Sequence, residues 1–306
     1  AAYRCGECKD EYRDALSIVL LSARLQAERA DGEDTSFTAV GLARELHAQG
    51  KFNEAEPLYR EVLETDRETL GNRHPDTLVS ISNLGSLLED KGDLAAAEPL
   101  YREALEVSRE TLGDRHPDTL AFMNNLGMLL HDKGGLAAAE LLYREALEVG
   151  RETLGDRHKS TLASINNLGL LLKDKGDLVA AAPLYREALE VRRETLGNRH
   201  PDTLCSIGNL GSLLRAKGDL AAAEPLHREA LEVQRKTLGN RHPSTLISIN
   251  NLGLLLKDKG DLAAAEPLMR EALEGLRETL GHEHPSTITC LGNFYILQES
   301  LAAGEL

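Results

Sequence analysis

Residues 77–118 read TLVSISNLGSLLEDKGDLAAAEPLYREALEVSRETLGDRHPD, and close copies of this stretch precede and follow it along the chain. The copies are spaced by 42 residues. A near-identical helical unit repeated in tandem is typical of a solenoid, which stacks its repeats and acts through an extended surface. The period is marked by a Leu-Gly pair at Leu70-Gly71, Leu112-Gly113, Leu154-Gly155, Leu196-Gly197, Leu238-Gly239 and Leu280-Gly281.

The repeats account for most of the chain. Six units of 42 residues fill residues 35–286 when each is counted from the Thr of its first helix. Residues 1–34 do not match the repeat, but they contain apolar residues at helical spacing, which predicts an N-terminal capping helix. Residues 287–306 match only the first half of a repeat and are predicted to form a C-terminal capping helix. Because a solenoid grows its core by stacking, we expect one continuous body.

Each repeat contains the signals of two helices. Apolar residues recur at spacings of three and four over residues 77–91, which predicts a helix with one apolar face. Pro75 fits its first turn, where the missing N–H has no intrahelical partner. Gly92 ends this helix and Asp93 caps a second one, predicted over residues 94–112. The fold is therefore predicted to be all-α and built of helix–turn–helix hairpins.

This hairpin resembles the tetratricopeptide repeat, and its 42-residue length resembles the variety found in kinesin light chains. The resemblance implies a right-handed superhelical solenoid whose first helices line a concave face that holds a peptide or helix of a partner protein. The small residues are expected where the two helices of a hairpin approach most closely. The residues that carry the resemblance to the tetratricopeptide repeat are Asn83-Leu84-Gly85, Gly92-Asp93, Ala97, Tyr101 and Ala104-Leu105.

The resemblance also places partner-binding candidates on the first helices. A ladder of Asn residues offers amides that both donate and accept hydrogen bonds, as the backbone of an extended peptide requires. Three later repeats add a row of cations. The alternatives are that each amide satisfies a neighbouring helix and that each cation is merely solvated. The candidates are Asn83, Asn124, Asn125, Asn166, Asn167, Asn209, Asn250, Asn251, Lys173, Arg215 and Lys257.

A series of His residues, most of them followed by Pro, precedes the first helices. Neighbouring members belong to different helical layers, about 8–10 Å apart for each packing distance, whereas zinc ligands lie within about 2.1 Å of one ion. We therefore predict no metal site, and a loop role in which each His hydrogen-bonds near the start of the next helix. Cys5 and Cys8 form a CxxC pair without the further ligands or the βαβ context that a zinc or redox site needs.

The composition excludes several classes of function. The formal net charge of -15 disfavours nucleic acid and bilayer surfaces as partners, and no apolar run is long enough to insert into a membrane. No catalytic or cofactor motif stands out, so neither a catalytic residue nor a cofactor is predicted. A cytoplasmic location is expected; because the chain begins with Ala1 and not Met, removal of a targeting leader stays an alternative.

Two hypotheses for the function follow from the sequence. The first is a non-enzymatic protein–protein interaction scaffold that binds a peptide or helix of a partner on its concave face. The second is a structural subunit of a large multiprotein complex, held through its convex face or its ends. Peptide binding would be saturable and sensitive to the Asn residues of the first helices, whereas a subunit would copurify with its complex.

Overall fold

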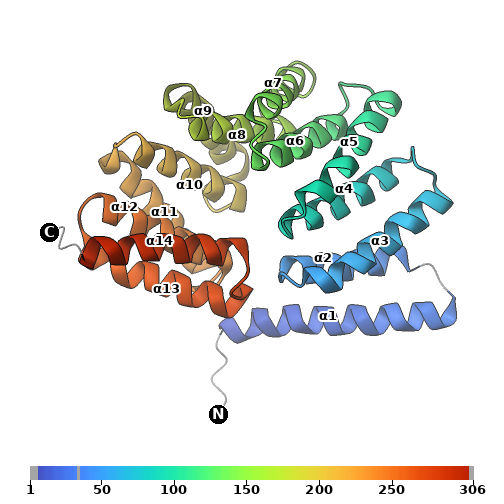
Figure 1. Cartoon of the computed structure of the whole chain (residues 1–306), viewed down its shortest axis with the longest axis horizontal. Helices are drawn as coiled ribbons and strands as arrows, with labels where there is room; N and C mark the ends of the chain where they lie inside the picture. Colours follow the sequence, from blue (N-terminus) through green and yellow to red (C-terminus); the bar gives the residue numbers. More distant parts are fainter. Residues whose placement is uncertain (1–5, 33–34, 303–306) are drawn as a thin grey trace, which may run out of the picture. The chain divides into compact units, whose positions relative to one another are not determined.

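A computed structural model describes residues 6–32 and 35–302, without the side chains of residues 6–16, so Cys5 and the side chain of Cys8 lie outside the described part. The described part contains fourteen α-helices and no strand, which confirms the all-α solenoid of hairpins (Figure 1). The helices are α1 (Gly6–Asp31), α2 (Ser36–Ala48), α3 (Phe52–Thr69), α4 (Pro75–Asp90), α5 (Leu94–Thr111), α6 (Pro117–Asp132), α7 (Leu136–Thr153), α8 (Lys159–Asp174), α9 (Leu178–Leu196), α10 (Pro201–Ala216), α11 (Leu220–Thr237), α12 (Pro243–Asp258), α13 (Leu262–Leu280) and α14 (Pro285–Ala302).

The chain divides into two compact units, and the division falls inside α8. Residues 1–167 form the first unit, in which α2 packs on α3, α4 on α5 and α6 on α7. Residues 168–306 form the second, in which α9 packs on α10, α10 on α11 and α12 on α13. The period of 42 residues continues through α8 without an insertion, so the sequence carries no mark of this division.

The His residues begin the first helices. His74 is the N-cap of α4, and its Nδ1 accepts a hydrogen bond from the backbone N of Asp76 at 3.2 Å. Lys159 stands where the other repeats have Pro, yet the backbone N of Ser160 still donates to Nδ1 of His158 at 3.2 Å. The predicted loop role is thus confirmed. The same bond is made by His116, His200, His242 and His284.

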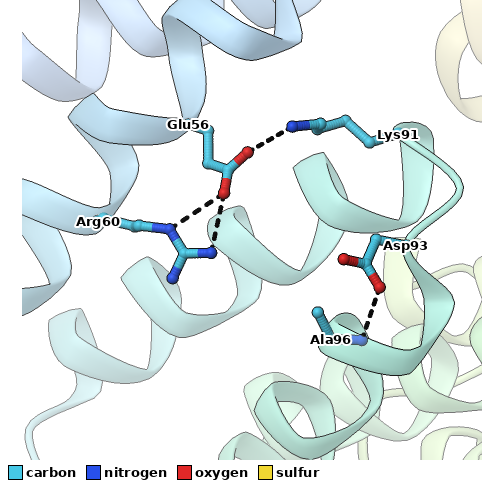
Figure 2. A network of polar contacts seen from close by, with 5 residues as sticks. All are labelled: Glu56, Arg60, Lys91, Asp93 and Ala96. Atoms are coloured by element: carbon cyan, nitrogen blue, oxygen red, sulfur yellow. Dashed lines mark hydrogen bonds and ion pairs between the residues drawn. The ribbon is translucent and has the colours of Figure 1, made fainter.

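The turn within each hairpin follows the predicted chemistry. Gly92 has φ of +81°, a left-handed conformation that favours glycine. Asp93 is the N-cap of α5 and accepts a hydrogen bond from the backbone N of Ala96 at 3.1 Å (Figure 2). These two residues end one helix and start the next within a single tight turn.

A large side chain of each second helix occupies the space beside a glycine of the first helix. A Cβ added to Gly85 would lie 2.8 Å from Cε1 of Tyr101, which is closer than real Cβ contacts come. Tyr101 is 2% exposed. The predicted close approach is therefore a contact between the tyrosine ring and the backbone of α4. The equivalent contacts join Gly127 to Tyr143, Gly169 to Tyr185, Gly211 to His227 and Gly253 to Met269.

The first and last helices flank the repeats of their own units. Leu25 of α1 belongs to the core of the first unit, and the hydroxyl of Thr38 in α2 donates to Glu28 of α1 at 3.0 Å. In the second unit α14 packs on α13 and α12. Its Leu297 is fully buried, whereas Tyr295, which stands where the other first helices have glycine or alanine, is 67% exposed.

Candidate functional site

Four of the candidate Asn residues are engaged in hydrogen bonds between repeats. Asn124 is 4% exposed, and its Nδ2 donates to the hydroxyl of Ser164 and to the carbonyl of Leu120, both at 2.8 Å. Nδ2 of Asn167 donates to Oδ1 of Asn124 at 3.3 Å. Buried amides of this kind join adjacent first helices and leave little surface for a partner. Asn124 therefore does not lie on the exposed surface to which the sequence assigned it.

The same kind of contact recurs in both units. In the first unit, Nδ2 of Asn125 donates to the hydroxyl of Ser82 at 2.9 Å. In the second unit, Asn250 is 6% exposed and its Oδ1 accepts from the Cys290 thiol at 3.4 Å. Asn250 is thus, like Asn124, a buried residue and not a surface candidate. For these residues the alternative reading, in which each amide satisfies a neighbouring helix, describes the structure.

The remaining amides differ from these. Asn83 and Asn251 are partly exposed, and no hydrogen bond of their side chains is found within the described part of the chain. Nδ2 of Asn209 makes only a long contact of 3.9 Å with Sγ of Cys205, and Oδ1 of Asn166 is buried without a hydrogen bond in that same part. Asn83 and Asn251 therefore retain both a free donor and a free acceptor.

The three candidate cations are paired with neighbouring carboxylates. Arg215 forms an ion pair of 2.9 Å with Asp258 on the next first helix. Lys257 lies 3.7 Å from the same Asp258, and Lys173 lies 3.6 Å from Asp174. All three cations have side chains less than a third exposed. Such pairs reduce the attraction that these cations exert on an acidic partner.

Glu89 stands at the position that carries these cations in later repeats. It accepts a hydrogen bond of 2.8 Å from the Tyr101 hydroxyl, while its other oxygen is buried without a hydrogen bond in the described structure. Burial raises the pKa of Glu89 from 4.5 to about 7, against the opposing effect of the Tyr101 hydrogen bond. The sequence does not reveal this burial, because it comes from packing between helices.

His227 is the second buried titratable group that the sequence did not reveal. It is 2% exposed and occupies the place of Tyr101, Tyr143 and Tyr185 beside a glycine. Burial, helped by the nearby charge of Arg215, lowers the pKa of His227 from 6.5 to about 4. It therefore serves as a neutral core residue.

Exposed apolar side chains recur on the first helices. We use the term first-helix face for the exposed surface of α2, α4 and α6 in the first unit and of α10 and α12 in the second. Phe37 is 84% exposed and Val79 48% exposed, and the period of 42 residues places them at the same position of adjacent repeats. Ile247 of α12 occupies this position in the second unit and is 40% exposed. Phe37 was missed by the sequence analysis, although its register with Val79 could have identified it.

An apolar residue and a free amide recur together on the first-helix face. Val79 and Asn83 lie four residues apart on α4, and Ile247 and Asn251 lie four residues apart on α12. Residues at this spacing are neighbours on one side of a helix. Each pair therefore offers an apolar contact beside an unsatisfied hydrogen-bonding group.

Other kinds of site are not seen in the described part of the chain. No group of three or more His, Cys, Asp or Glu residues within it is arranged to hold a metal ion. None of the helices described here combines the length and the apolar character that crossing a membrane requires.

The comparisons with known proteins agree with this architecture. The family model of the tetratricopeptide repeat matches residues 34–106, 76–152, 130–194, 160–236, 202–278 and 244–299. The chain therefore belongs to the tetratricopeptide repeat family. Members of this family generally mediate protein–protein interactions and are generally not enzymes. None of the curated protein sequences matches the chain.

Solved structures place it beside kinesin light chain-like repeat proteins. A kinesin light chain-like protein of Podosopora anserina with nearly identical TPR-like repeats aligns with a TM-score of 0.54 and 26% identity, over 66% of this chain and 95% of that one. BtubC (BKLC) from P. vanneervenii aligns with a TM-score of 0.57 and 26% identity, over 79% of this chain and 94% of that one. The chain is thus similar to these proteins in both fold and repeat type.

Proposed function

We propose that this protein is a non-enzymatic scaffold that binds segments of a partner protein on the first-helix face of each unit. The observation that carries the proposal is the recurring pair of an exposed apolar side chain and a free amide, Val79 with Asn83 and Ile247 with Asn251. Burial of apolar surface supplies most of the affinity in such interfaces, and hydrogen bonds to the partner backbone fix its register.

The first unit offers the larger apolar surface. Phe37 and Val79 occupy one position of adjacent repeats, and Met128 of α6 adds a third large apolar side chain that is 42% exposed. Full burial of such a side chain stabilises a complex by about 1.5–3 kcal/mol. Asn83 lies one helical turn from Val79, where it can bond to the backbone of a segment that covers the apolar residues.

Peptides selected from a displayed library against the parent protein provide a defined probe for this proposal. The variant Val79→Ser with Ile247→Ser should weaken the binding of the selected peptides at least tenfold. The control is Leu141→Ser, because Leu141 is 70% exposed but lies on the second helix α7. The proposal fails if the peptides bind the double variant as tightly as the parent while Leu141→Ser weakens them.

A second function is favoured by one specific observation on α14. Its Ile288 is 56% exposed, Tyr295 is 67% exposed and Ile296 is 51% exposed, and Glu299 is the only charged residue in the helix. A helix that is apolar on several sides is usually covered. This surface supports the alternative of a subunit held in a larger complex through one end. Copurification that depends on Ile288 and Tyr295, and not on Val79, would favour it.

The proposal includes a protein partner in the cytoplasm and no nucleic acid. The net charge of -15 supports the exclusion of nucleic acid, since a polyanion would be repelled. The free thiols of Cys205 and Cys290 support the cytoplasmic location, because reducing compartments keep thiols unpaired. Fluorescence imaging of the tagged protein in its native cell tests the location.

A further inference from the structure

A bridging carboxylate recurs between adjacent repeats on the second helices. Glu56 accepts hydrogen bonds from Nε and Nη2 of Arg60, at 3.1 and 2.8 Å, and from Nζ of Lys91 at 2.5 Å. Figure 2 shows the Glu56 carboxylate between these two cations. Arg60 lies one turn later on α3, whereas Lys91 is the C-cap residue of α4 in the next repeat. One carboxylate thus holds two cations from two repeats.

Other repeats reproduce this bridge with the same residue types. Glu98 pairs with Arg102 and Lys133, and Glu224 pairs with Arg228 and Lys259. The hydrogen bonds from the lysine and the arginine lower the pKa of Glu56, and the equivalent bonds lower that of Glu98 and Glu224. The two cations therefore form an environment that favours an ionised carboxylate.

The fourth repeat lacks the carboxylate but keeps both cations. Ala182 stands at the position of Glu56, Glu98 and Glu224, while Arg186 and Lys217 match the positions of the arginine and the lysine. Lys217 is the C-cap residue of α10, which packs against α9. Within the described residues neither Arg186 nor Lys217 forms an ion pair. Both side chains are exposed.

A second departure lies on the same side of α9. Val179 replaces the alanine that stands at this position in four other repeats, and it is 79% exposed. It precedes Ala182 by three residues and Arg186 by seven, spacings that place all three on one side of the helix. Val179 thus lies one turn from Ala182 and two turns from Arg186 on the same side of α9.

We propose that Arg186 and Lys217 form a binding site for a carboxylate of an acidic segment of a partner protein, with Val179 as an apolar contact at its edge. The partner's carboxylate takes the place that Glu56 and its equivalents occupy in the other repeats. The net charge of -15 repels acidic segments from the molecule as a whole, so the attraction is confined to cations that lack an internal carboxylate. This site lies on α9 and α10 outside the Val79 and Ile247 pairs and does not depend on the proposed function.

The probe is a fluorescein-labelled peptide of alternating leucine and glutamate, with a leucine and glutamine peptide as its matched control. Fluorescence anisotropy at low ionic strength should show binding of the glutamate peptide to the parent protein and none of the glutamine peptide. Ala182→Glu supplies an internal bridge and should weaken binding at least tenfold. Ala182→Gln has nearly the same size without the charge and should retain most of the binding.

Two further variants leave Ala182 unchanged, so they test the proposal even where a substitution at position 182 disturbs folding. Lys217→Gln removes one exposed cation and should weaken the glutamate peptide severalfold, with unchanged circular dichroism. Glu224→Ala frees Arg228 and Lys259 and should add a second binding site, raising the stoichiometry from one peptide to two. The proposal is overturned if Lys217→Gln binds the peptide as the parent does, or if Glu224→Ala adds no site.

Discussion

Replacement of Glu89 by Gln tests how the packing of α4 against α5 controls a buried charge. The pKa of Glu89 is raised from 4.5 to about 7, mainly by burial. The folded state therefore binds a proton between these pH values that the unfolded chain releases. The contribution that this proton on Glu89 makes to the stability of the fold is fully present below pH 4.5 and is lost as the pH rises through about 7. At pH 8 the folded protein holds an ionised carboxylate that its surroundings disfavour.

The expected size of the effect follows from the same values. The rise from 4.5 to about 7 corresponds to about 3–4 kcal/mol, at about 1.36 kcal/mol per pH unit. Screening by solvent at this partly exposed site reduces the expected value to about 1–2 kcal/mol. Glu89→Gln keeps an oxygen that accepts the hydrogen bond from Tyr101 and removes the charge. The variant should therefore be about 1–2 kcal/mol more stable than the parent at pH 8 and equally stable at pH 4.

Urea unfolding followed by circular dichroism at pH 4, 6 and 8 measures this difference. Glu148→Gln is the control, because Glu148 is exposed on α7 and its replacement should change the stability little at any pH. A Glu89→Gln variant that matches the parent at pH 8, or that is destabilised equally at all three pH values, would refute the reasoning. Burial would then not raise the pKa of Glu89.

Further predictions concern the core and the contacts between repeats. Gly169→Ala should lower the thermal midpoint by several degrees, because its Cβ would lie 2.9 Å from a tyrosine ring, whereas Gly208→Ala, with open space around it, should leave the midpoint unchanged or raise it. The pKa of His227 is lowered to about 4, so its contribution to stability is present above pH 6.5 and is lost as the pH falls. The thermal midpoint of the variant His227→Phe should therefore fall less between pH 7 and pH 5 than that of the parent protein. Asn124→Ala should cost about 1–3 kcal/mol in urea unfolding, and Asn83→Ala less than about 0.5 kcal/mol, because only the first amide is buried and bonded.

The hairpins and their boundaries could be predicted because their signals are local. Pro75, Gly92 and Asp93 act within a few residues of their own positions, and the structure gives each the predicted role. The caps of the His series could be predicted for the same reason. Short-range backbone geometry decides these features, and one repeat is enough to read them.

The roles of the Asn residues depend on contacts between repeats and could not be read in the same way. Asn124 bonds to Ser164, 40 residues away, whereas Asn83 has no such bond in the described structure, although both lie on first helices. Which residue faces the neighbouring helix is set by packing, and adjacent positions on one helix can differ completely. The raised pKa of Glu89 likewise arises from burial between packed helices.

Departures from the repeat carry more functional information than the repeat itself. A feature shared by all repeats, such as the His N-cap, stabilises every hairpin in the same way and cannot fix where along the array a partner binds. A partner that recognised only shared features could bind equally well one repeat away. Specificity needs positions that differ. Phe37, Val79 and Ile247 enlarge a position that is alanine in the third and fourth repeats, and Ala182 removes a carboxylate that other repeats keep. These differences supply the register that an otherwise uniform array lacks, and they are therefore the positions at which substitution should separate binding from stability.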